Sequence, residues 1–264
     1  MSEKKSTELW SSISLPSKFK PYTQKECKIR PLKVGEVRQI QSSIDGTSGL
    51  SIAEIIRDAV SIPVLDLTHG DFWFVLAWLR INTYRNYPLS LEWKCKNKHT
   101  NSLVIDLTKI NIVELSSEYS EPVILKTENR KLSLRLPRVG DEILARKYLS
   151  EINDDGAFTQ EDVDQACQAL QLVTGQSLYH NLEALKEIEA DPDGPEIIVK
   201  IDSLKTVFSH GLPRLLSDKC KECKYQASDI YFPFRFSDLT PRITVIKDFR
   251  SDLSFSETSE LPSK

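Results

Sequence analysis

Two short turns, each carrying a pair of possible metal ligands, constrain the fold of this chain more than any other feature of its sequence. The first turn holds Cys95 and His99, and the second holds Cys220 and Cys223. Thiolate sulfur and imidazole nitrogen are the ligands of four-coordinate structural zinc sites, and two such turns, each leading into a strand, are typical of a zinc ribbon. We therefore predict one structural zinc site with these four ligands, because no coordination position is left for water or substrate.

Two other interpretations of the same residues stay open. In the first, Cys95 is a thiol at the end of a strand, His99 is a surface histidine, and the two later cysteines are merely reduced. In the second, Cys220 and Cys223 form a redox-active pair, which is disfavoured because no βαβ pattern surrounds them. The Cys-x2-Cys turn is also a more specific metal motif than the Cys-x3-His turn.

A strongly apolar helix is predicted ahead of the first turn. Thr68 and Asp71 have the spacing of a capping box, with aspartate in the usual glutamate position. Apolar residues then occupy nearly every side of a helix that runs to Thr83, which is typical of a buried helix. Alternating apolar residues at 89–93 and a second apolar run at 102–107 predict the two strands that flank the turn.

The segment between the two turns is predicted to be an insertion. Its pattern favours a hairpin at 119–136, followed by four amphipathic helices that begin near residues 141, 159, 177 and 195. One shared metal would close the loop between the ends of this segment. The entropic cost of closure grows slowly with loop length, whereas structural zinc contributes about 10–16 kcal/mol in finger peptides, so the metal term outweighs it.

The predicted fold class is α+β, a mixed core with a zinc-ribbon-like element and an inserted helical subdomain. Five parts are expected along the chain: a flexible arm at 1–20, a mixed core with the first turn at 21–110, the hairpin and helical insertion at 111–210, the second turn and closing strands at 211–250, and a disordered tail at 251–264. The last closing strand is expected at 244–246. Trp10 in the arm is expected either to contact a partner protein or to fold back on its own domain.

Composition excludes several classes of protein without naming a function. The chain has five cysteines and no signal peptide, and it lacks the continuous apolar run that a membrane-spanning helix needs. These features indicate a soluble protein of a reducing compartment. The net charge of −3 is uneven, because residues 1–40 hold nine Lys or Arg against four acids, while residues 151–210 hold three against 13. This asymmetry favours contact with charged neighbours.

No catalytic constellation is recognisable in the sequence. His69, His180 and His210 are scattered, and there is no Gly-x-Ser-x-Gly elbow, phosphate loop or Gly-x-Gly-x-x-Gly motif. Cys27 and Cys167 fall at apolar periodic positions and are predicted to be core thiols. We therefore predict that the protein is not an enzyme.

Several short motifs in the first half of the chain resemble a known family. They are Leu15-Pro16-Ser17, Arg30-Pro31-Leu32, and Leu67-Thr68-His69-Gly70-Asp71-Phe72 running into Leu79-Arg80 and Cys95. Together they resemble the baseplate hub and hub-assembly proteins of contractile-tailed phages of the T-even type, over about residues 15–140. The sequence departs from the family pattern at His99, where a second cysteine would be usual.

The resemblance implies a function as well as a family. It implies a non-enzymatic protein made in the cytoplasm of the infected bacterium, which acts in baseplate hub assembly or stays in the virion tail baseplate. Its partners would be other baseplate or tail proteins. The alternative is a nucleic-acid-binding zinc ribbon, suggested by the lysines around the ligands, which are Lys94, Lys96, Lys98, Lys219, Lys221 and Lys224. These lysines more simply balance thiolate charge, and no aromatic stacking platform interleaves with them.

Overall fold

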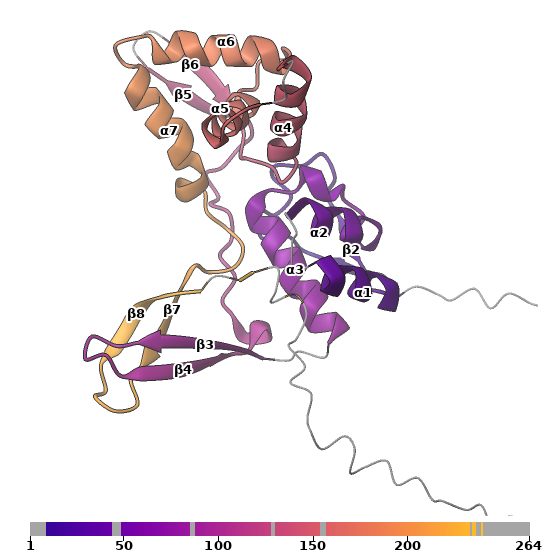
Figure 1. The fold of residues 1–264 in the computed structure, drawn as a ribbon, viewed down its shortest axis with the longest axis vertical. Helices are drawn as coiled ribbons and strands as arrows, with labels where there is room; N and C mark the ends of the chain where they lie inside the picture. The colour runs from indigo at the N-terminus through magenta and orange to yellow at the C-terminus, as the bar shows by residue number, and fades with distance from the viewer. Residues whose placement is uncertain are drawn as a thin grey trace, which may run out of the picture.

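The fold is α+β, as predicted, and it consists of three parts that Figure 1 shows one above another. The computed structural model describes residues 9–43, 49–84, 88–127, 130–153, 157–232, 234–235 and 239. In these residues every sheet is a two-stranded antiparallel hairpin. The three parts are a central core around helix α3, a unit of four helices with a small hairpin, and a pair of long hairpins at the opposite end.

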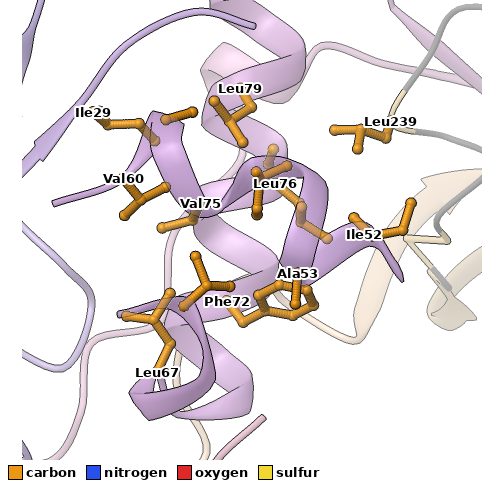
Figure 2. Close-up of a cluster of buried hydrophobic side chains, with 14 of the residues drawn as sticks. Ile29, Ile52, Ala53, Val60, Leu67, Phe72, Val75, Leu76, Leu79 and Leu239 are labelled. Carbon is orange, nitrogen blue, oxygen red and sulfur yellow. The ribbon is translucent and has the colours of Figure 1, made fainter. Parts of the chain in front are cut away.

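The central core forms around α3 (His69–Thr83), the helix that the apolar pattern predicts. Val75, Leu76 and Leu79 are completely buried, while the indole rings of Trp73 and Trp78 pack on the rim of the same cluster. Figure 2 shows α3 side chains meeting Ile52 and Leu239 from other segments. The surrounding elements are β1 (Ser11–Ile13), β2 (Cys27–Ile29), α1 (Val34–Ser43), α2 (Gly49–Ile56) and the short 3-10 helices Arg57–Ala59, Val64–Asp66 and Leu107–Lys109.

The N-terminal end of α3 has hydrogen bonds to other chain segments that a capping box does not have. Thr68 is the N-cap and its hydroxyl accepts the Asp71 N–H, as the spacing predicts. The Asp71 carboxylate does not return to the Thr68 N–H, which donates instead to the Tyr22 hydroxyl at 2.9 Å. Asp71 accepts hydrogen bonds from the Tyr22 hydroxyl and from the Ser17 N–H at 3.0 Å. The buried carboxylate therefore joins α3 to the N-terminal segment.

Residues 9–20 correct the prediction of a flexible arm over residues 1–20. Ser11–Ile13 pairs with Cys27–Ile29, and Leu15 is completely buried in the central core. The apolar side chains of Ile13 and Leu15 gain more from burial than the segment loses in chain entropy. Residues 1–8, the predicted strand at 244–246 and the predicted tail at 251–264 lie outside the described residues.

The four-helix unit has a hydrophobic core of its own. It contains the hairpin β5 (Val123–Lys126) and β6 (Lys131–Leu134), then α4 (Asp141–Ile152), α5 (Gln160–Gln171), α6 (Leu178–Glu189) and α7 (Gly194–Val207). Thr159 and Asp162 form a reciprocal capping box at the start of α5, the helix that was predicted to begin near residue 159. Leu185, Ile197 and Ile201 are completely buried between the helices. The hairpin and all four helices were predicted from periodicity.

The chain enters and leaves this unit through one closely packed junction. Val113 and Gly211 pair as an antiparallel bridge, so the two ends of the segment lie side by side. Gly211 has a φ of +94°, and a Cβ there would lie 2.3 Å from the Gly70 carbonyl oxygen, so only glycine fits without displacement. The His210 side chain is buried against this contact, with Nε2 2.7 Å from the Thr68 hydroxyl.

The third part consists of two hairpins that lie side by side at the lower end of Figure 1. The first is β3 (Leu89–Lys94) with β4 (Thr100–Ile105), and the second is β7 (Leu215–Lys219) with β8 (Gln226–Tyr231). The strand β7 was not predicted, because it carries few apolar side chains. The Trp93 indole N–H donates to the Asp218 carboxylate at 2.9 Å and thereby links the hairpins.

Candidate metal centre

The turns of the two hairpins bring the four predicted ligands together, although the first and last of them are 128 positions apart in the sequence. Cys95 follows β3 and Cys220 follows β7, and each turn is aimed at the other. The possible ligand atoms of Cys95, His99, Cys220 and Cys223 all lie within 4.8 Å of one another. Cys95 and Cys220 are buried, whereas His99 and Cys223 are partly exposed at the tip.

Two of the separations between ligand atoms match those of a tetrahedral zinc site. Zn–S bonds of about 2.3 Å and Zn–N bonds of about 2.05 Å place two sulfurs about 3.8 Å apart and a sulfur and a nitrogen about 3.6 Å apart. The Sγ atoms of Cys95 and Cys223 are 3.7 Å apart, and Cys220 Sγ lies 3.7 Å from His99 Nδ1. All five cysteines are free thiols, so no disulfide competes for these sulfurs. The residues present therefore fit a metal ion such as zinc.

Backbone geometry at each turn directs the ligands inward. Lys98 and Lys224 have φ values of 64° and 61°. Both values lie in the left-handed region, which non-glycine residues seldom adopt. The Lys98 N–H donates to the Cys95 carbonyl at 2.8 Å, and the Lys224 N–H donates to the Cys220 carbonyl at 3.1 Å. The first bond spans three positions and the second spans four, so each turn is closed by a local backbone hydrogen bond, although the two sequences differ.

The two turns differ in the residue that closes them. The Cys95 N–H donates to the His99 carbonyl, so His99 is the residue that closes its turn. In the second turn the closing residue is Tyr225, two positions after the ligand Cys223. His99 thus both closes its turn and offers a ligand atom, whereas the second turn divides these roles between Tyr225 and Cys223.

The electrostatic environment favours thiolate at two of the three cysteines. Burial raises the pKa of Cys220, but the N–H groups of Cys223 and Glu222 and the His99 ring outweigh it and lower the pKa to about 6. The Tyr225 N–H lowers the pKa of Cys223, whereas burial raises the pKa of Cys95. Thiolate is the form of cysteine that binds metal, and a bound cation deprotonates the remaining thiol.

The lysines that surround the ligands do not form a nucleic-acid platform. All six are exposed or partly exposed around the two turns. The neighbouring aromatic residue, Tyr225, is partly buried, and the Lys96 ammonium lies 5.0 Å from its ring centroid. A base stacks on an open aromatic face, and here a side chain of the protein occupies a face of the ring. Nothing in this geometry favours the nucleic-acid alternative.

The predicted partner contact, Trp10, lies in the central core part and takes no part in the metal centre. Its side chain is 41% exposed, and the Arg30 guanidinium lies 6.0 Å from its ring centroid. Arg30 is itself buried and forms two hydrogen bonds with the Glu36 carboxylate, at 2.7 and 3.0 Å. Trp10 therefore rests partly on its own domain and still presents part of its ring to solvent.

Two features of the structure escaped sequence reasoning. The first is the cluster of Tyr22, Thr68, Asp71 and His210, which joins chain segments and contains one of the histidines expected to be scattered. The second is a groove of about 1190 Å³ between the four-helix unit and the second hairpin, whose aromatic lining includes Trp73, Phe208, Tyr231, Phe232 and Phe234. Both features are formed by residues that are far apart in the sequence, so no local sequence pattern predicts them.

Comparison with known proteins identifies the class to which this chain belongs, namely the proteins of the phage baseplate. The model of the family described as T4 bacteriophage base plate protein matches residues 14–189, two thirds of the chain. The protein belongs to this family, which confirms the resemblance found in the short motifs. No curated protein and no solved structure matches the chain.

The matched region contains only half of the metal centre. It includes Cys95 and His99, and it ends at residue 189, ahead of Cys220 and Cys223. The family match therefore supports the baseplate class and bears on neither the metal nor its identity. In the described residues no helix is both long and apolar enough to cross a membrane.

Proposed function

We propose that this protein is a non-enzymatic component of the phage baseplate hub, or a factor that assembles the hub, and that it acts by protein–protein association. Family membership supports a structural role in the baseplate. The observation that carries the association is the exposed pair of Leu9 and Trp10, whose side chains are 81% and 41% exposed. Partly exposed tryptophans on a rigid base are frequent anchors of protein interfaces.

The base beneath Trp10 is well ordered by its contacts. Arg30 is held by Glu36 through a bidentate pair that is almost entirely buried. The strand β1 follows Trp10 directly and pairs with β2, which directly precedes Arg30. An aromatic side chain that is already positioned loses little conformational entropy when a partner covers it. This preorganisation supports Trp10 as a contact residue of the folded core, in place of a tethered arm.

Substitution of Trp10 tests the proposed contact. Because β1 begins at Ser11, a point change is preferable to deletion of the N-terminal residues, which would remove a paired strand. Trp10→Ala should weaken binding to the purified baseplate partner by at least about tenfold, as expected for an interface hot spot, and leave the melting temperature within about 2 °C. Binding is measured by calorimetry against each baseplate protein of the same phage.

Tyr179→Ala is the matched control for this experiment. Tyr179 is an aromatic residue of α6 that is 56% exposed, and it belongs to the four-helix unit and not to the central core part that holds Trp10. We expect it to bind partners like the unmutated protein. If Trp10→Ala binds the partner undiminished and Tyr179→Ala loses binding, the contact surface lies on the acidic four-helix unit and not at Trp10.

We also propose where the protein resides. It is made in the cytoplasm of the infected bacterium and acts there during assembly, and as a hub component it is retained in the baseplate of the virion tail. Mass spectrometry of purified virions distinguishes the two roles, because a component is present in stoichiometric amounts and an assembly factor is absent.

A structural zinc ion is the second part of the proposal. Cys95, His99, Cys220 and Cys223 would hold it, and it would supply a tetrahedral cross-link between the turns of the two hairpins. The segment 111–210 would then be an insertion whose ends the metal holds together. The matching separations of 3.7 Å support this assignment. Elemental analysis of the purified protein should give about one zinc per chain, the stoichiometry of a four-ligand site.

A further inference from the structure

The two ring nitrogens of His99 have different neighbours. Nδ1 lies 3.7 Å from Cys220 Sγ, at the centre of the ligand cluster. Nε2 lies 3.4 Å from a carboxylate oxygen of Glu222, on the outer side of the ring. The side chains of His99 and Glu222 are 33% and 65% exposed, so this second contact lies at the protein surface.

We infer that His99 binds the metal through Nδ1 and that Glu222 is a positioning residue, which accepts a hydrogen bond from the Nε2–H and so fixes the ring. This inference rests on the proposed metal centre. A histidine ligand is a neutral imidazole with one protonated nitrogen, and the hydrogen bond made by that nitrogen decides which nitrogen faces the metal. Metal-binding histidines commonly direct their other N–H to a carboxylate in this way.

The position of Glu222 in the sequence explains how it reaches the ring. Glu222 lies between Cys220 and Cys223 in the second turn, whereas His99 closes the first turn. The second turn therefore provides two thiolates and also the carboxylate that orients the ligand of the opposite turn. The contact between Glu222 and His99 joins the half-sites independently of the metal.

A histidine at position 99 serves this arrangement better than a cysteine would. A cysteine at position 99 has a shorter side chain at the closing position of the turn, and it has no second atom for Glu222 to bind. Histidine and Glu222 together thus replace the second cysteine of a Cys-x2-Cys turn. Glu222 is exposed, and exposed charge pairs contribute little, so its effect should lie at the lower end of the range for such residues.

The ligand atom can be tested without any substitution. In the zinc-loaded protein labelled with ¹⁵N, long-range proton–nitrogen spectra distinguish the two nitrogens of His99. We expect a metal-bound Nδ1 and a protonated Nε2, and in the cadmium-113 form we expect coupling from the metal to Nδ1. Coupling to Nε2 would overturn the assignment.

The positioning role is tested with Glu222→Ala. Zinc affinity, measured by competition with a chelator, should fall about tenfold, the lower limit for loss of such a partner. Glu222→Gln, which keeps an acceptor oxygen, should recover part of the loss, and Glu92→Ala, an exposed glutamate on β3, should show none.

Three outcomes separate the inference from the proposal beneath it. Unchanged affinity in Glu222→Ala, with Nδ1 still bound to the metal, would overturn the positioning role alone. Equal losses in Glu222→Ala and Glu92→Ala would overturn it as well, since the effect would then be one of general charge. No zinc in the unmutated protein would overturn the metal centre itself, and the inference with it.

Discussion

The four-helix unit and the pair of long hairpins differ sharply in what holds them together. In the described residues the helical unit buries thirteen apolar side chains in one cluster, whereas the hairpins share a cluster of five, two of which are the candidate ligands Cys95 and Cys220. A two-stranded hairpin by itself is marginally stable in water. The helical unit can thus rely on burial of apolar surface, and the hairpins need a cross-link, which a structural metal would provide.

Loss of a ligand should have the largest effect, and it should be confined to the hairpins. Cys220→Ser should reduce zinc from about one per chain to near zero, and thereby remove most of the roughly 10–16 kcal/mol that zinc contributes in finger peptides. Hydrogen exchange should then accelerate in β3, β4, β7 and β8 and stay slow in α5, α6 and α7. Cys167→Ser is the matched control, because it makes the same substitution in α5. Melting of the helices together with the hairpins would show that the helical unit also depends on the metal.

A cavity in the helical unit should have the opposite distribution. Leu185 is completely buried. Leu185→Ala should therefore lower the free energy of unfolding by about 2–5 kcal/mol, without changing zinc content. Chemical denaturation followed by circular dichroism provides the measurement. Zinc loss in Leu185→Ala would mean that the two regions fold as one.

An exposed valine of the same unit provides the control for this cavity. The Val199 side chain in α7 is 66% exposed. Val199→Ala should change the free energy of unfolding by less than about 0.5 kcal/mol, as surface substitutions usually do. A loss as large as that of Leu185→Ala would show that the cavity is not the cause.

The buried charge pair beneath Trp10 should give a smaller effect that depends on pH. Burial raises the pKa of Glu36, but hydrogen bonds from Arg30 and the Lys33 N–H outweigh it, so the pKa lies below the ordinary value for glutamate. A depressed pKa contributes stability above the ordinary value of about 4.3, and this is lost as pH falls through the lower folded value. Glu36→Gln should therefore cost about 1–2 kcal/mol at pH 7, and this cost should shrink as pH falls below about 4.3 and disappear below the folded pKa of Glu36.

A matched substitution controls for surface charge. Glu26 contacts Lys28 at 3.6 Å in a pair that is more than half exposed. Exposed pairs contribute little, so Glu26→Gln should have almost no effect at any pH. Denaturation curves between pH 3 and 8 provide the measurement. A pH-independent difference between Glu36→Gln and the unmutated protein would show that the carboxylate charge is not what matters.

The smallest effect is expected from the lysines of the hairpin turns. Lys96→Glu should leave zinc content unchanged, and the unmutated protein should not be retained on DNA or RNA at about 150 mM salt, where non-specific binding is typically in the range of about 10⁻⁴–10⁻⁶ M. Submicromolar binding that weakens steeply with salt and is lost in Lys96→Glu would instead favour the nucleic-acid alternative.

Prediction from sequence was most accurate where neighbours along the chain decide the structure. Apolar periodicity predicted α3 and the helix that begins near residue 159, and the structure confirms both elements. Prediction from sequence was wrong where a residue distant in the sequence takes the hydrogen bond that a local pattern predicts. Asp71 has the spacing of a capping residue, yet its carboxylate bonds with Ser17 and Tyr22, which are distant in the sequence. The strand β7 went unpredicted because its pairing with β8, and not its own pattern, makes it a strand.

The sequence by itself determined the α+β class, the helices of the insertion, the four candidate ligands and the family. Each of these follows from residues that are close together in the sequence: the apolar periodicity of single elements, the two short turns, or the short motifs of the first half. Only the tertiary structure decided that residues 9–20 belong to the core, that His210 packs against Gly70 and Thr68, and that Nδ1 of His99 faces the ligands while Nε2 faces Glu222. These features depend on contacts between segments far apart in the chain, and periodicity carries no information about which distant side chain will fill a given space.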